Sequence, residues 1–244
     1  MKKFLIWLVN SVIYLILRIL LKIEVAGLDQ VPMHGPLIVA TNHVNFLDAP
    51  VVITLLAPRP ITALVKREIW DKPVMPFLFN LWGGIPIDRG VADFNAFKEA
   101  KTALLEENKL LAVAPEGTRT EDGHLIRGKP GIAILASRTG VPVLPMAYYG
   151  HEDFKRNIRR FKRTPITIRV GQPFRCKFEG HAKDKHVMQA VTDAIMLEIA
   201  DLLPEEYHGE YAGVVVPRRQ YLDYLDPLSG EQVTQSFGEQ FTHT

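Results

Sequence analysis

The first residues of the chain form a nearly unbroken apolar run from Phe4 to Leu21, with lysines at both ends. As a helix, these 18 residues would be roughly 27 Å long at about 1.5 Å each, close to the hydrocarbon thickness of a bilayer. A cleaved signal peptide would end in a small-residue cleavage site, and none follows this run. A core helix of a soluble protein would be apolar along one stripe only. We therefore expect residues 1–23 to form a membrane-associating helix that either spans the bilayer or lies in its interface.

The rest of the chain alternates short β-branched runs with stretches of helical periodicity, a pattern typical of strands joined by crossover helices. The β-branched runs predict strands at residues 37–40, 61–65, 85–87, 110–114, 141–148 and 165–170. The helical stretches predict helices at residues 49–56, 73–82, 94–105, 131–138 and 188–202. The expected fold class is therefore α/β, with a mixed central sheet flanked by helices. We expect one domain over residues 24–207 and a polar, loosely ordered tail over residues 208–244.

Composition narrows the class of protein only slightly. The 244 residues are 47% hydrophobic and carry a formal net charge of +2, from 29 Lys and Arg against 27 Asp and Glu. This apolar fraction with balanced charge excludes global disorder, and it leaves any argument about charged partners to local clusters. Cys176 is the only cysteine, which excludes an intrachain disulfide and a multi-cysteine zinc site. We expect it to be a buried or incidental cysteine rather than a reactive one.

A polar cluster follows the first of these strands and precedes a predicted helix, over residues 42–48. Open α/β sheets bind their ligands at the carboxyl ends of strands, where this cluster falls. His43 has a carboxylate five residues later, at Asp48. The two side chains can meet if His43 lies in the loop and Asp48 lies in the first helical turn. Such a pair often arises by chance, so it predicts a site only together with other clusters.

Three further clusters could contribute to the same site. Residues 83–90 place flexible glycines around a short strand that ends in an acid and an arginine, and a guanidinium suits bidentate phosphate recognition. Residues 115–120 follow the next strand, and here Gly117 permits close approach of the backbone to a ligand while the next two side chains can hold an anion. Residues 140–145 contain no ionisable group and would shape a wall.

The clusters occur in the order of the four motifs of the glycerolipid acyltransferases: His43 with Asp48, then residues 84–89, 116–119 and 141–145. Over roughly residues 25–205 the sequence resembles the bacterial 1-acylglycerol-3-phosphate acyltransferases, also called lysophosphatidic acid acyltransferases. The order of four motifs is far more specific than any one of them. The second motif departs from the family's pattern, because Ile-Pro-Ile-Asp-Arg lacks the Phe that many members have before the Ile, but it keeps the arginine.

The resemblance implies an enzyme that moves a fatty acyl group from acyl-CoA or acyl carrier protein to the free hydroxyl of 1-acyl-glycerol-3-phosphate, giving phosphatidic acid. It implies that His43 is the general base and that Asp48 orients its imidazole. The arginines would bind phosphate, and Glu116 would hold either its loop or a glycerol hydroxyl. The implied substrate-binding residues are Lys66, Gly84, Arg89, Glu116, Gly117, Thr118 and Arg119. This mechanism needs no metal and no cofactor.

Several alternatives compete with this function. The acceptor could instead be glycerol 3-phosphate or another lysophospholipid. A non-catalytic membrane protein could bind phospholipid head groups with the same basic pocket, but it would have no use for the imidazole of His43. Residues 123–129 match the spacing of a nucleotide-binding phosphate loop, yet Pro130 occupies the place of its Ser or Thr. No serine has the flanking glycines of a hydrolase nucleophile elbow.

A basic run over residues 155–163 holds six cations in nine residues. A solvated face is the simplest interpretation, and no nucleic-acid-binding module accompanies the run. Beside an apolar N-terminal helix, however, these cations would be drawn to an anionic leaflet or to the phosphates of an acyl-CoA. We expect membrane lipids, lysophosphatidic acid and the acyl donor as partners, no nucleic acid, and a location at the cytoplasmic face of the cell membrane.

Overall fold

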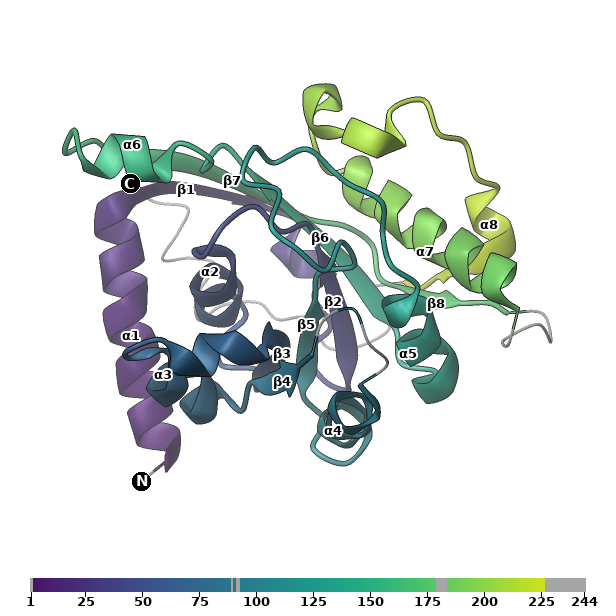
Figure 1. The fold of residues 1–244 in the computed structure, drawn as a ribbon, viewed down its shortest axis with the longest axis horizontal. Helices are drawn as coiled ribbons and strands as arrows, with labels where there is room; N and C mark the ends of the chain where they lie inside the picture. The colour runs from purple at the N-terminus through teal and green to yellow at the C-terminus, as the bar shows by residue number, and fades with distance from the viewer. Residues whose placement is uncertain (1, 89, 91–92, 179–183, 227–244) are drawn as a thin grey trace.

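A β-sheet forms the centre of the protein (Figure 1). The structure is a computed structural model, and it describes residues 2–88, 90, 93–178 and 184–226. The strands in these residues are β1 (Leu21–Ala26), β2 (Leu37–Thr41), β3 (Ile61–Lys66), β4 (Ile85–Ile87), β5 (Leu110–Val113), β6 (Val143–Tyr149), β7 (Thr164–Val170), β8 (Phe174–Cys176) and β9 (Leu222–Tyr224). Their order across the sheet is β1-β7-β6-β2-β5-β3-β4, with β8 paired to β6 and β9 paired to β8.

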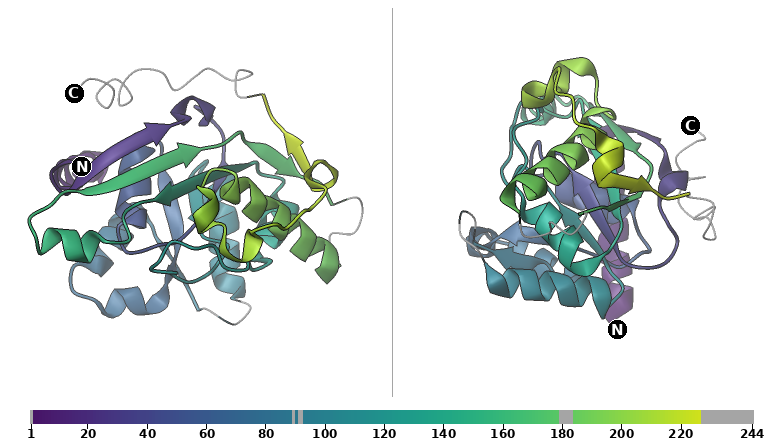
Figure 2. Two further views of the ribbon diagram at one scale, coloured as in Figure 1. Left: turned by 90° about the horizontal axis from the view of Figure 1, so that it is seen from above. Right: turned by 90° about the vertical axis from the view of Figure 1, so that its right-hand side faces the viewer.

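The sheet is mixed, as predicted. Strands β2 to β6 run parallel to one another, whereas β7 is antiparallel to β6. Strand β1 is parallel to β7, and Figure 2 shows these two strands side by side. Because parallel strands end at the same edge of a sheet, the residues that follow β2, β3, β5 and β6 gather along one edge.

Helices cover both faces of the sheet (Figure 1). They are α1 (Lys2–Leu20), α2 (Asp48–Leu55), α3 (Met75–Trp82), α4 (Phe94–Leu105), α5 (Gly131–Thr139), α6 (Phe154–Ile158), α7 (Lys185–Ala200) and α8 (Arg218–Tyr221). In β2, Leu37 and Val39 belong to the core cluster that includes residues of α1, α2 and α3, while Ile38 and Ala40 belong to the cluster that includes residues of α4, α5 and α7. A strand buried on both faces has a continuous apolar sequence, which is the pattern that predicted β2.

The N-terminal helix ends earlier than expected. Helix α1 stops at Leu20, and the next three residues begin β1, where Leu21 to Ile23 lie in register with Thr164 to Ile166 of β7. Leu21 is fully buried in this pairing. In the sequence, Leu21 continues the apolar run of the N-terminal helix. In the structure it belongs to the sheet, because pairing with a distant strand outweighs the local sequence pattern.

Residues 208–226 are more ordered than the sequence predicts. The side chain of Tyr211 is buried, and its hydroxyl accepts a hydrogen bond from Gly128 N–H (3.0 Å) and donates one to Asp193 Oδ1 (2.9 Å). Strand β9 then extends the sheet through β8. This segment is therefore part of the domain, and residues 227–244 of the predicted tail lie outside the described residues.

The cysteine has the inert environment expected of it. Cys176 is a free thiol in β8 and packs against the hydrophobic core. Burial raises its pKa to about 12, so the thiol stays protonated near neutral pH. Since the thiolate is the reactive form, Cys176 is not a nucleophile under these conditions.

Candidate active site

The loop between β2 and α2 brings His43 and Asp48 together. His43 Nδ1 lies 2.7 Å from Asp48 Oδ2. As the sequence predicts, His43 lies in the loop and Asp48 is the first residue of α2. Asp48 is buried, whereas the His43 side chain retains 17% of its exposure. An ionised carboxylate can only accept a hydrogen bond, so the imidazole donates from Nδ1 and its Nε2 is left as a proton acceptor.

The loop folds around the carboxylate of Asp48. The backbone N–H groups of Val44 and Asn45 donate to Oδ2 at 2.8 and 3.0 Å. The side-chain Oδ1 of Asn45 accepts from Leu47 N–H (2.9 Å) and so forms the turn into α2. The start of a helix also favours a negative charge. Asp48 therefore binds the imidazole of His43 and also fixes the backbone of the loop that carries His43.

A second histidine contacts the other oxygen of this carboxylate, and sequence reasoning missed it. His151 Nε2 lies 2.7 Å from Asp48 Oδ1, and the His151 side chain is fully buried. Asn45 Nδ2 donates to the His151 carbonyl at 3.0 Å. The position of His151 in the chain could have indicated its place in the site, because it closely follows β6, whose carboxyl end lies beside that of β2.

Asp48 keeps its charge despite its burial. Burial, the largest influence, would by itself raise the pKa of this carboxyl group. Hydrogen bonds and charge interactions with His151 and His43 outweigh it, so the pKa of Asp48 lies below its ordinary value. The side chain is therefore an anion near neutral pH.

Glu116 joins the loop after β5 to the loop that carries His43. Its Oε1 accepts from His43 N–H (2.8 Å) and its Oε2 accepts from Ile126 N–H (3.2 Å). In return, Thr120 N–H donates to the His43 carbonyl at 2.9 Å. Burial raises the pKa of Glu116 to about 7, although the two backbone donors act in the opposite direction. These contacts are those expected of a residue that holds its loop.

Two exposed cations lie in segments that adjoin Glu116. Gly117 has a φ of +68°, and a Cβ at this position would lie 3.0 Å from Lys129 Nζ, so glycine suits both the backbone conformation and the close contact. Thr118, Arg119 and Lys129 are exposed. Among the described residues, neither cation has a carboxylate within ion-pair distance. A glycine turn with unpaired cations is suited to an anionic ligand.

The other predicted binding residues are dispersed. Lys66 ends β3, at the same edge of the sheet as His43, and its Nζ pairs with a neighbouring glutamate at 2.9 Å. Gly84 precedes β4, at the opposite end of that strand from this edge. A Cβ on Gly84 would lie 3.0 Å from Cδ1 of Phe79, so close packing accounts for this glycine. Arg89 lies outside the described residues.

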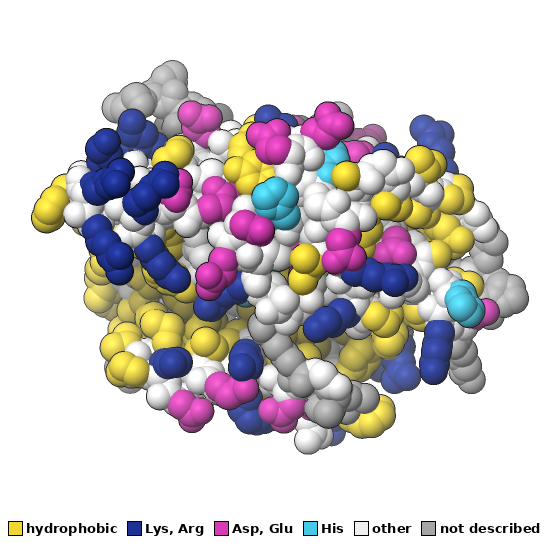
Figure 3. Space-filling model, turned by 45° about the horizontal axis from the view of Figure 1, so that its top comes forward, with side chains coloured by type: hydrophobic (Ala, Val, Ile, Leu, Met, Phe, Trp, Pro, Cys, Tyr) yellow, Lys and Arg dark blue, Asp and Glu magenta, His cyan; other side chains and the backbone are white. Residues whose placement is uncertain are grey.

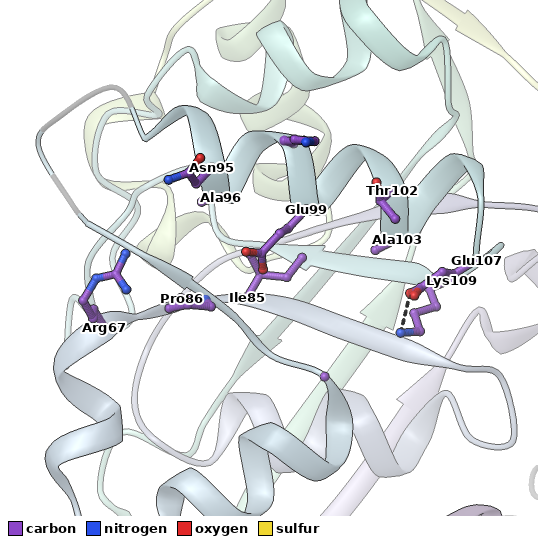
Figure 4. Close-up of a pocket in the computed structure, with 12 residues that line it drawn as sticks. Arg67, Ile85, Pro86, Asn95, Ala96, Glu99, Thr102, Ala103, Glu107 and Lys109 are labelled. Carbon is purple, nitrogen blue, oxygen red and sulfur yellow. Dashed lines mark ion pairs between the residues drawn. The ribbon is translucent and has the colours of Figure 1, made fainter.

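A cleft of about 600 Å³ lies along β4 and α4, and its lining does not include His43 (Figure 4). Many of its charges are neutralised within the protein: Lys109 pairs with Glu107 at 2.6 Å and Arg67 pairs with Asp88 at 2.7 Å. The cleft therefore offers an anion little unpaired charge. Within the described part of the chain, no group of three or more His, Cys, Asp and Glu side chains is placed to hold a metal ion.

Glu116 should make stability depend on pH. A pKa raised to about 7 on folding favours the protonated native state, so this contribution is fully present below the ordinary pKa of 4.5 and is lost as the pH rises through about 7. Relative to Glu116→Gln, the free energy of unfolding of the wild type should fall by about 1.4 kcal/mol per pH unit across this window.

Urea denaturation of both proteins between pH 4.5 and 8 measures this difference. The histidines are common to both proteins, so their titration largely cancels. Glu210→Gln, at an exposed position, is the matched control and should leave the pH dependence unchanged. A difference that does not vary with pH would show that folding does not raise the pKa of Glu116.

Known proteins are similar to this chain in sequence. The family model described as Acyltransferase matches residues 22–149, more than half of the chain. A 1-acyl-sn-glycerol-3-phosphate acyltransferase of Limnanthes alba is 32% identical over 154 residues, which are 62% of this chain and 54% of that protein. The protein of the same name from Bacillus subtilis (strain 168) is 27% identical over 184 residues, which are 74% of this chain and 87% of that protein. The chain thus spans about half the length of the plant relative.

The fold also occurs in a crystal structure of the 1-acyl-sn-glycerophosphate (LPA) acyltransferase PlsC from Thermotoga maritima. The TM-score is 0.62 at 22% sequence identity, over 82% of this chain and 79% of that chain. The span matched by the family model contains His43, Asp48 and Glu116, and it ends just before His151. The chain belongs to the Acyltransferase family.

Proposed function

We propose that this protein transfers a fatty acyl group from an acyl thioester to the free hydroxyl of 1-acyl-glycerol-3-phosphate, giving phosphatidic acid. The observation that carries the proposal is the buried, ionised Asp48 held 2.7 Å from Nδ1 of a partly exposed His43. The names of the relatives, 1-acyl-sn-glycerol-3-phosphate acyltransferases, support the choice of acceptor. The donor is the thioester of coenzyme A or of acyl carrier protein.

In this reaction His43 is the general base. Its Nε2 takes the proton of the acceptor hydroxyl while that oxygen attacks the carbonyl carbon of the thioester. A C–O bond forms, the C–S bond of the tetrahedral intermediate then breaks, and the imidazolium returns its proton to the leaving thiolate. The products are an ester and a free thiol. Asp48 keeps the Nδ1 proton of His43 directed inward and stabilises the transient imidazolium.

The acceptor's phosphate binds beside the third motif. Arg119 and Thr118 extend from the segment that is hydrogen-bonded to the His43 loop. Lys66 ends β3 at the same edge, and Arg89 follows β4, the next strand of the sheet. Several cations are appropriate because a phosphate monoester carries close to two negative charges near neutral pH.

Two alternatives would use the same groups differently. Glycerol 3-phosphate or another lysophospholipid could be the acceptor, and one labelled acyl-CoA tested against a panel of acceptors distinguishes them. A non-catalytic lipid-binding protein would not need a buried carboxylate behind an imidazole. Burying that charge costs free energy, and such pairs are concentrated at catalytic sites. The His43–Asp48 geometry therefore favours an enzyme.

Replacement of the base should abolish turnover and spare binding. His43→Ala should lower kcat by about 10²–10⁴-fold, the usual contribution of a positioned general base. Asp48→Asn should retain weak activity, because its amide cannot accept from both imidazoles at once. Transfer of a labelled acyl group measures turnover, and calorimetry measures binding of the acceptor. If His43→Ala kept more than about a tenth of the wild-type rate, this mechanism would be wrong.

Loss of a phosphate-binding arginine should affect the acceptor more than the donor. Arg119→Ala and Arg89→Ala should each raise the KM for lysophosphatidic acid about tenfold or more, with little change in the KM for the acyl donor. A neutral monoacylglycerol should be a poor acceptor. Arg127→Ala, at an exposed position, is the control. Equal rates with phosphorylated and neutral acceptors would show that these arginines serve the structure instead.

We further propose that α1 lies on a membrane surface rather than across it. Its 19 residues could cross a bilayer by length and composition alone. One side, however, packs along the domain: Leu17 is buried, and Trp82 Nε1–H donates to Asn10 Oδ1 at 2.9 Å. A spanning α1 would draw the attached domain into the hydrocarbon region. The opposite side is apolar and exposed, and it carries Phe4, Trp7, Val12, Leu15 and Ile19.

The basic run adjoins this helix. Arg163 Nη2–H donates to the carbonyl oxygens of Arg18 (2.8 Å) and Leu21 (2.6 Å), at the end of α1. Figure 3 shows Lys and Arg side chains gathered at the upper left, next to hydrophobic side chains. Phe161, within the run, is fully exposed. Cations beside exposed apolar groups would bind an anionic leaflet, and we place the protein at the cytoplasmic face of the cell membrane.

Two sets of substitutions should separate the apolar and charged parts of this binding. The apolar set replaces Phe4, Trp7, Leu15 and Ile19 with Ser. It should weaken membrane binding, and the binding that remains should be sensitive to salt. The charge set replaces Lys155, Arg159, Arg160 and Lys162 with Gln, and it should remove the preference for anionic lipid. Both sets leave Leu17 and Arg163 in place, so the contacts between α1 and the domain are kept.

Co-sedimentation with anionic and zwitterionic vesicles across a salt series measures these effects. Lys98→Gln with Lys101→Gln, on α4, is the control for lost charge elsewhere. If the charge set bound both kinds of vesicle as the wild type does, the basic run would have no role at the membrane.

A further inference from the structure

We infer that His151 is a third member of the catalytic arrangement, a positioning residue that holds the Asp48 carboxylate from the side opposite His43. The inference rests on the proposed function, because it gives His151 a part in the reaction assigned to His43. Two contacts carry it, each of 2.7 Å: Asp48 Oδ2 to His43 Nδ1, and Asp48 Oδ1 to His151 Nε2. His151 is fully buried, so it acts through Asp48 and not on a substrate.

The carboxylate determines where His151 carries its proton. Asp48 has no proton to donate when ionised, so a neutral His151 must donate from Nε2. Its Nδ1 is then a bare acceptor, and this atom is buried without a hydrogen-bond partner among the described residues. Within the described part of the chain, the side chain of His151 therefore makes its hydrogen bond to Asp48 and to no other group.

Two further titratable side chains, Glu116 and Tyr148, act on this cluster. Among the described residues, both interact with His43 or Asp48. The Tyr148 ring lies edge to face with His151, with centroids 6.1 Å apart, and burial raises its pKa well above the ordinary value, so Tyr148 is neutral. The pKa of Glu116 is about 7, and this group acts on Asp48 through its charge. Asp48 itself stays ionised.

The contact has two consequences for the base. A carboxylate held through one oxygen can turn about its Cβ–Cγ bond, and a donor on Oδ1 prevents that rotation. The same donor draws negative charge toward Oδ1, which limits how strongly Asp48 stabilises the imidazolium of His43. His151 thus sets both the orientation and the basicity of His43.

Two variants separate positioning from packing. His151→Gln can place an amide N–H where Nε2 lies and so can still donate to Asp48, whereas His151→Leu fills the space without a donor. We expect His151→Leu to lower kcat about tenfold or more with little change in the acceptor KM. In the pH profile of kcat/KM for His151→Leu, we expect the acid limb to move to higher pH by about half a unit or more. The reason is that Asp48 then holds the imidazolium of His43 more strongly. His151→Gln should keep most of kcat and the wild-type limb.

A second measurement needs no turnover. In the full-length protein with ¹⁵N-labelled histidine, the His151 ring should carry a proton on Nε2, because that atom donates to Asp48. The signal that disappears in His151→Gln assigns the ring. His186→Leu, on the exposed first turn of α7, is the control for loss of a histidine elsewhere. If His151→Leu does not fold, the His151→Gln profile and the ¹⁵N shifts still decide the question.

The inference is overturned if folded His151→Leu keeps the wild-type kcat and acid limb, if His151→Gln loses both, or if His151 carries no proton on Nε2. Failure of the proposed function is a different result, namely that the wild type transfers no acyl group to any acceptor. In that case the ¹⁵N shifts still test whether His151 donates to Asp48 through Nε2.

Discussion

An ionised carboxylate buried at the start of a helix must be satisfied by hydrogen bonds, and the rest of the site is arranged around that requirement. Asp48 receives two backbone N–H groups and two imidazole rings. Without them, burial would raise its pKa and favour the neutral acid. The donors come from the loop after β2 and the end of β6, so the charge is stable only when these parallel strands lie side by side.

The two buried carboxyl groups of the site differ because their donors differ. Burial would raise the pKa of Asp48, but hydrogen bonds and charge interactions with the two imidazole rings outweigh it and lower that pKa. Glu116 receives backbone N–H groups from His43 and Ile126, which do not offset its burial, and its pKa rises to about 7. One carboxylate is thus suited to hold a base in place, and the other to join two loops in a way that depends on pH.

The proposed membrane surface is joined to the site through the sheet. Helix α1 continues directly into β1, which pairs with β7 along its whole length. Arg163, immediately before β7, binds the carbonyl groups at the end of the helix. Leu20 of α1 is followed at once by Leu21 of β1, so a protein docked through α1 would hold the carboxyl edge of its strands in a constant position relative to the lipid.

The sequence by itself determined the strands buried on both faces, most of the helices and the order of the motifs, because apolar periodicity records burial over a few residues. It also placed His43 and Asp48 correctly, since a loop and the first turn of a helix are local structures. Only the tertiary structure decided that Leu21 belongs to β1, that residues 208–226 complete the domain, and that close packing accounts for Gly84. The tertiary structure also decided the contact of His151 with Asp48 and the raised pKa of Glu116. Burial and hydrogen-bond partners arise only when segments far apart in the chain assemble at one edge of the sheet.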